Sequence, residues 1–158
     1  MKRIRKEWNL WIFGTFAVLG IAALTACQSG PPQISIEGAK AELSQAIIGE
    51  AMVSMKIVNQ GGGDMMTGVK TNIPGATASF HVMQGERMAA VKKMRVPAKN
   101  TLEFKMGGSH VMIENMPKSM NEGSPFILTL VFEKSGEKQV PLTLQKAMPM
   151  PMSHEHHM

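Results

Sequence analysis

The sequence is poor in cysteine and in aromatic residues. Cys27 is the single cysteine among 158 residues, there is no tyrosine, and both tryptophans, Trp8 and Trp11, lie near the N-terminus. A single cysteine excludes an intramolecular disulfide and leaves no thiolate for redox or metal chemistry in the rest of the chain. A domain after Cys27 must fill its core with aliphatic side chains, methionine and a few rings. The rings available are Phe80, Phe104, Phe126 and Phe132.

A strong excess of positive charge is also missing once the N-terminus is set aside. The formal net charge is +5, but Lys2, Arg3, Arg5 and Lys6 supply four of the 17 basic residues, and Glu7 supplies one of the 12 acidic residues. The remaining chain has 13 basic and 11 acidic residues. A net charge of +2 gives no basis for predicting nucleic-acid binding.

The first 26 residues have the features of an export signal. A basic start precedes an apolar run, residues 10–24, that is too short for an ordinary transmembrane helix. The following Leu-Thr-Ala-Cys resembles the bacterial lipobox, which ends in a lipid-modified cysteine. We therefore expect a lipoprotein signal peptide at 1–26, and a lipidated Cys27 with a short tether at 27–33. The domain would be extracytoplasmic, anchored to a bacterial membrane on its periplasmic or outer face. An ordinary secretory signal is the alternative.

Alternation of apolar and polar residues predicts an all-β domain at 34–146. Residues 51–58 alternate with a period of two, and residues 125–132 and 139–144 flank a Glu-Lys-Ser-Gly turn as the clearest hairpin. This pattern and the absence of a helical period predict a β-sandwich of about seven strands. Shorter strands are predicted at 34–36, 76–83, 91–96 and 101–105.

After Lys146 the sequence changes to alternating proline and methionine, followed by histidine. Alternating proline forbids both a helix and a central strand, which predicts an extended, mobile tail at 147–158. Its thioethers could hold Cu(I) and its imidazoles Cu(II), so the tail is a second candidate metal site, and a tail that binds nothing is the alternative. The tail residues concerned are Met148, Met150, Met152, His154, His156, His157 and Met158.

Two short motifs pair histidine with methionine. Before the tail the only histidines are His81 and His110, and each has a methionine two residues later, Met83 and Met112. In a strand, residues i and i+2 project from the same face, so each motif offers an imidazole nitrogen and a thioether sulfur to one point. Thioether selects Cu(I), whereas zinc sites prefer thiolate, imidazole and carboxylate. The motifs therefore predict a copper site, and a buried histidine pair among core methionines is the alternative.

The spacing of these residues resembles the motif of the periplasmic copper chaperones called PCuAC. That motif is approximately His-x-Met, ten residues, Met, about twenty residues and His-x-Met, and here His81, Met83 and Met94 match its first part. His110 and Met112 match its last part.

One interval departs from the family pattern. Residues 95–109 are fifteen rather than about twenty, which we interpret as a shortened hairpin around residues 97–100. The segments 51–64, 107–110 and 117–145 are also similar to the family, so the likeness extends over most of the predicted domain.

The resemblance implies a cupredoxin-like or immunoglobulin-like Greek-key β-sandwich that carries Cu(I). The implied ligands are His81, Met94, His110 and Met112, with Met83 as a weaker candidate. It also implies a role in cytochrome oxidase assembly, in which copper passes to a respiratory oxidase subunit or to a thiol-based copper assembly protein.

Other functional classes fit the residues less well. The two domain histidines supply no Ser/His/Asp set or three-histidine metal cluster, and there are no paired carboxylates, so we do not expect an enzyme. A blue-copper centre requires the cysteine thiolate that the domain lacks. The remaining alternatives to a chaperone are a copper-sequestering resistance lipoprotein and a metal-free β-sandwich used in adhesion or assembly. Methionines 52, 55, 65 and 66 are expected in the core, at least in part. Met88, Met106, Met116 and Met120 are assigned to packing or to the rim of the site.

Overall fold

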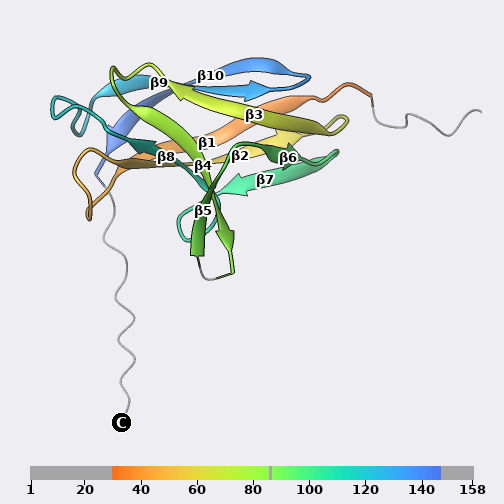
Figure 1. Cartoon of the computed structure of the whole chain (residues 1–158). Helices are drawn as coiled ribbons and strands as arrows, with labels where there is room; N and C mark the ends of the chain where they lie inside the picture. Colours follow the sequence, from red (N-terminus) through yellow and green to blue (C-terminus); the bar gives the residue numbers. More distant parts are fainter. Residues whose placement is uncertain (1–29, 86, 147–158) are drawn as a thin grey trace, which may run out of the picture.

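The computed structural model describes residues 30–85 and 87–146 (Figure 1). The predicted signal peptide, Cys27 and the Met/His tail lie outside the described residues. The described chain folds into strands joined by turns and loops, and it contains no helix that could cross a membrane. The strands are β1 (Ile34–Leu43), β2 (Ala51–Asn59), β3 (Asp64–Thr71), β4 (Thr77–Gln84), β5 (Arg87–Val91), β6 (Met94–Val96), β7 (Asn100–Phe104), β8 (His110–Glu114), β9 (Pro125–Phe132) and β10 (Gly136–Gln145).

The strands form a barrel-like β-sandwich, which confirms the predicted all-β class. Hydrogen-bonded neighbours follow the order β5-β4-β8-β2-β1-β10-β9-β3-β6, and β7 also pairs with β2. In Figure 1, β3, β9 and β10 form one layer over β1, β2 and β8. The long β1 connects the layers, because it is antiparallel to β2 and parallel to β10.

The core lies between these layers and follows the alternation seen in the sequence. Every second residue of β2 from Ala51 is buried, and so is every second residue of β9 from Phe126. Met55 and Met66 are core residues, as expected, and Met116 is buried as well. Met120 is partly buried against the same cluster. Met52, by contrast, lies on the other face of β2 from the buried Ala51 and Val53, so its placement in the core was wrong.

A buried asparagine fastens the N-terminal segment to two turns. The side-chain oxygen of Asn59 accepts hydrogen bonds from the Gln33 and Gly61 N–H groups, and its amide donates to the carbonyls of Gly62 and Pro97. Only glycine fits at position 61, because a Cβ there would collide with the Pro31 carbonyl oxygen. This end of the sandwich is therefore fixed by polar contacts rather than by the apolar core.

Several details of the predicted strand pattern were wrong. The described residues form ten strands rather than about seven. β3 was not predicted, and its alternation is interrupted near Gly68, where the register with β9 shifts. The single strand predicted at 91–96 is two strands, because the chain leaves β5 and crosses to the other layer before β6. The hairpin predicted around 97–100 is absent: β6 pairs with β3, and β7 pairs with β2.

Candidate metal centre

The two domain histidines face each other across a strand pair. β4 and β8 are antiparallel, and His81 lies directly opposite His110 in the register. Their ring centroids are 5.6 Å apart, and the rings are tilted by 39°. Although far apart in the sequence, the two imidazoles therefore lie close enough to share one ion.

The core determines which way these imidazoles point. Phe80 and Val111 are neighbours of the two histidines in the chain and partners of each other in the register, and both are buried in the core. Because successive side chains in a strand alternate between faces, His81 and His110 project from the outer face of the sheet. The pair is thus supported by the core without being part of it.

His110 is only 5% exposed although it projects outward. Its Nδ1 lies 3.0 Å from the carbonyl oxygen of Gly108, which accepts a hydrogen bond from the Nδ1–H tautomer. The tight turn before β8 places that carbonyl, since the Lys105 N–H bonds to Ser109 and the Gly108 N–H bonds back to Lys105. Gly107 has φ near +74°, a conformation that favours glycine. The neutral tautomer selected by this bond leaves Nε2 with a free lone pair for a metal ion.

The charge state of His110 also suits metal binding. Burial lowers the pKa of His110, the hydrogen bond to Gly108 raises it, and the nearby His81 lowers it; the net pKa is below the ordinary value. His110 is therefore neutral at neutral pH, which is the form that coordinates metal.

Met112 occupies the next outward position on β8. In the register it lies between Ser79 of β4 and Met52 of β2, and all three are partly buried. Consecutive outward positions on a strand are about 7 Å apart, a gap that a methionine side chain and an imidazole can close together. His81, His110 and Met112 therefore form a compact group with two nitrogens and one thioether.

Met83 lies two residues beyond His81 on the same face of β4. It is 41% exposed, and its register partner on β5 is Met88. The pairing of β4 with β8 ends at His81 and His110, so Met83 lies at the open edge of the group.

Met94 lies in a different environment from the other candidates. It belongs to β6, opposite Met66 of β3, and it packs against the hydrophobic core. β6 is at the opposite end of the strand order from β4 and β5. The strand pairing does not bring Met94 to the imidazoles, and its role as a ligand stays a prediction.

Sequence reasoning missed Met52 and Ser79 beside the group, and it left Met88 between packing and the rim of the site. Met52 was assigned to the core, but it lies beside Met112 on the outer face. The Ser79 hydroxyl is buried and has no hydrogen-bond partner among the described residues, and it lies two positions before His81. Met88, like Met106, is exposed and so belongs to the rim rather than to packing. Ser79 and Met52 could have been found only from the strand register, which places both opposite Met112 and which the sequence does not give.

The group contains no hard ligands. Within the described residues there is no cluster of three or more His, Cys, Asp or Glu side chains that could hold a metal ion. Imidazole and thioether are therefore the donors on offer here, a combination that favours a soft ion such as Cu(I).

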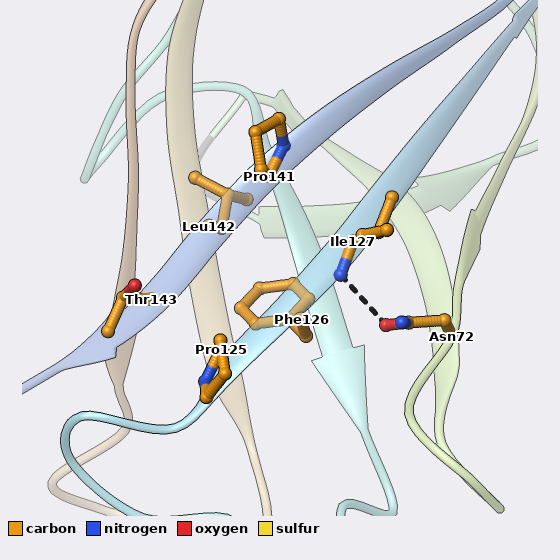
Figure 2. A pocket seen from close by; sticks show the side chains of 7 residues that line it. All are labelled: Asn72, Pro125, Phe126, Ile127, Pro141, Leu142 and Thr143. Carbon is orange, nitrogen blue, oxygen red and sulfur yellow. Dashed lines mark hydrogen bonds between the residues drawn. The ribbon is translucent and has the colours of Figure 1, made fainter.

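An open cavity of about 410 Å³ lies elsewhere on the domain (Figure 2). Its walls are residues 125–127 of β9, residues 141–143 of β10, and Asn72, whose Oδ1 accepts a hydrogen bond of 2.8 Å from the Ile127 N–H. None of these residues carries an imidazole or a thioether, and their strands lie away from β4 and β8 in the strand order. This cavity is therefore separate from the candidate metal centre.

Comparison with solved structures finds the same fold in PCuAC domains and in DR1885, in copper-bound and apo forms. The copper-bound PCuAC domain from PmoF2 is 25% identical, with a TM-score of 0.62 over 75% of this chain and 97% of that domain. The apo PCuAC domain from PmoF1 is 23% identical, with a TM-score of 0.59 over 77% of this chain and 98% of that domain. The Cu(I) form of DR1885 from Deinococcus radiodurans is 20% identical, with a TM-score of 0.58 over 78% of this chain and 85% of that protein.

Sequence comparison gives the family. No curated protein matches the chain in sequence. The model of the LpqE-like lipoprotein family matches residues 34–144, which include every described strand except the last residue of β10. The chain therefore belongs to the LpqE-like family, the PCuAC-type family that the spacing of its His-x-Met motifs predicted.

Proposed function

We propose that this domain is a copper chaperone that carries one Cu(I) ion between His81, His110 and Met112. The observation that carries the proposal is the facing imidazole pair, in which the Gly108 carbonyl orients His110 and leaves its Nε2 free. The copper-binding PCuAC domains with the same fold support a chaperone role. We propose no catalytic activity.

The choice of Cu(I) follows from the chemistry of the donors. Thioethers are soft and uncharged, and two neutral imidazoles add no negative charge, so a singly charged soft ion suits the group better than Zn(II). A thioether also avoids the disulfide formation that would disable a cysteine site in an oxidising compartment. We propose Met83 and Met94 as additional ligands, Met83 from the open edge of the group and Met94 from the family spacing.

The location and the recipient belong to the same proposal. Membership of a lipoprotein family supports an extracytoplasmic position. We propose a lipid anchor at Cys27 and a copper-collecting tail at 147–158, both outside the described residues, and delivery to a respiratory oxidase copper centre, directly or through a thiol-based assembly protein. A carrier needs an ion that it can release, and the site at the outer face of the sheet suits such exchange.

An anaerobic Cu(I) competition titration tests the proposal. The protein is residues 28–158, which include the whole described fold, and Met112→Leu is compared with Met65→Leu, a half-buried methionine on β3 in the other layer. We expect Met112→Leu to weaken Cu(I) binding by about tenfold or more, equivalent to about 1.4 kcal/mol, and Met65→Leu to leave it unchanged.

The same titration separates the alternatives. Leucine conserves the volume of methionine, so a loss of affinity with little change in unfolding free energy would identify a lost ligand. A chaperone should bind one ion at the folded site and pass it to a competing acceptor, whereas a sequestering protein should hold several ions and release them poorly. A protein that binds no Cu(I) would be the metal-free module, and the proposal would be wrong.

A further inference from the structure

Two methionines of the β4–β5 hairpin are exposed although nothing in the core requires them. Met83 and Met88 are 41% and 40% exposed, and they lie directly opposite each other in the register. Of the five large hydrophobic side chains exposed in the described chain, the only other methionine is Met106, in the turn before His110. Ile47 and Ile48 are the other two and lie in the loop between β1 and β2. The exposed thioethers are thus concentrated around the imidazole pair.

The hairpin projects beyond the rest of the sheet. β8 pairs with β4 only as far as His81, so residues 82–84 and 87–89 pair with each other alone. Figure 1 shows β4 and β5 extending away from the two layers. A two-stranded ribbon of this kind buries little apolar surface, and β-branched residues would suit its strands better than methionine. Packing and strand propensity therefore do not account for Met83 and Met88.

The positions of the two sulfurs suit a shared ion. Residues directly opposite each other in an antiparallel pair have Cβ atoms about 4.5–5.5 Å apart, and methionine has three rotatable side-chain bonds. The next outward row of the same strands contains His81 and Ala90. Because the two rows are about 7 Å apart, the thioether pair lies one step from the imidazoles and on their solvent side. Ala90 is exposed and small, so no bulky side chain lies opposite His81 in this row.

We propose that Met83 and Met88 form an outer Cu(I) station, through which the ion enters and leaves the His81–His110–Met112 group. This inference rests on the proposed function. The transfer is a ligand exchange in which copper stays Cu(I): the bond to the Met88 sulfur breaks as bonds to imidazole nitrogens form, and Met83, at the edge of the group, stays bound to the ion. No electron moves, and no proton is released from a neutral imidazole. Two uncharged thioethers bind more weakly than the full group, so the station passes the ion on rather than holding it.

The first test is the rate of copper exchange in residues 28–158. Copper-loaded protein is mixed anaerobically with bicinchoninate as the Cu(I) acceptor, and release is followed for wild type, Met88→Leu and Met65→Leu. We expect Met88→Leu to release copper about fivefold or more slowly while its equilibrium affinity changes by less than about threefold, since only the barrier is raised. Met65→Leu should match the wild type. Release from Met88→Leu at the wild-type rate would overturn the proposal.

The second test detects the station directly. Ag(I), a redox-inert substitute for Cu(I), is titrated into protein with 13C-labelled methionine methyl groups. We expect the Met83 methyl resonance to shift from the first equivalent, the Met88 resonance to shift chiefly beyond it, and the Met65 resonance to stay in place. A stationary Met88 resonance would refute the station even if the imidazole group binds normally. A protein whose imidazole group binds no Cu(I) in the competition titration would refute the proposed function as well, so the two failures are distinguishable.

Discussion

The β9–β10 hairpin and the β4–β5 hairpin use the same local structure in opposite ways. β9 and β10 share eight register pairs and have neighbours on both outer edges, β3 and β1. β4 and β5 share five pairs, and beyond His81 they have no other partner. The first hairpin buries alternate side chains from Phe126 to Phe132, whereas the second exposes Met83 and Met88.

The difference shows how this domain separates stability from chemistry. The leucine and phenylalanine side chains of β9 are buried in the hydrophobic core between the two layers. Soft metal donors lie on the outer face of β4 and β8, whose inner face still contributes Phe80 and Val111 to the core. We therefore expect substitutions in the first hairpin to change stability, and changes at the outer face of the second to alter copper affinity or the rate of copper exchange.

The largest expected effect is a loss of stability from a core substitution in β9. Leu128 is fully buried, so Leu128→Ala removes apolar contacts and leaves a cavity, which should lower the free energy of unfolding by about 2–5 kcal/mol. Chemical denaturation measures this loss. Cu(I) affinity of the folded protein should not change, and a large loss of affinity in protein that is still folded would mean that the two regions are not separate.

A smaller effect is expected at Asp64, which anchors the turn of the β9–β10 hairpin. Its carboxylate accepts hydrogen bonds from the Lys134 and Ser135 N–H groups and from the Ser135 hydroxyl. Replacing it with asparagine removes a charged acceptor of a buried site, so Asp64→Asn should cost about 1–3 kcal/mol of unfolding free energy.

The pH dependence gives an independent check on Asp64. Burial raises the pKa of Asp64, but hydrogen bonds from Ser135, Met65 and Lys134 outweigh it and hold the pKa below its ordinary value. Its stabilising effect is therefore fully present above the ordinary aspartate pKa of about 3.9 and is lost as the pH falls through the lower, folded value. The unfolding free energy of Asp64→Asn should lack this acid-dependent component; the same acid loss in both proteins would contradict the assignment.

A further prediction concerns how the Cu(I) affinity of the site changes with pH. Burial lowers the pKa of His110, so protonation competes with copper at this residue only below the ordinary histidine pKa of about 6.5. Cu(I) affinity should be nearly constant from about pH 8 to 6.5 and should fall at lower pH, by up to about tenfold per pH unit once His110 protonates. Competition titrations across this range measure the profile. A flat profile down to about pH 5 would exclude histidine from the site.

In the copper-free protein, His110 should also make the unfolding free energy depend on pH. Because the folded-state pKa of His110 is lowered, the unfolded chain binds more protons between that value and about 6.5. Unfolding free energy should therefore decrease as the pH falls through this window, and His110→Gln should remove that dependence.

Strands were predictable where one face is buried and the period is regular. β2 and the β9–β10 hairpin have clean alternation, and both lie close to their predicted bounds. β3 has a glycine at its register shift, which breaks the period, and β6 is only three residues long. The crossing from β5 to β6 depends on which layer each strand joins, and local sequence does not encode that choice.

The sequence predicted the types of donor atom at the site better than it predicted which residues surround it. The spacing of the His-x-Met motifs pointed to His81, His110 and Met112, and these three lie together in the register. Met52 could not be recognised, and Met88 could not be assigned to the rim rather than to packing, because each gains its position from a partner on another strand. Met94 illustrates the reverse case: its spacing matches the family, but its strand pairs on the other layer.

The sequence by itself determined the all-β class, the soft donor set and the absence of a thiolate in the described domain, because these follow from residue type and from a period of two. Only the tertiary structure decided that His81 stands opposite His110 on the outer face and that the Gly108 carbonyl selects the tautomer of His110. The physical reason is register: a slip of one residue would turn either imidazole to the other face of the sheet, and register is fixed by core packing between distant strands.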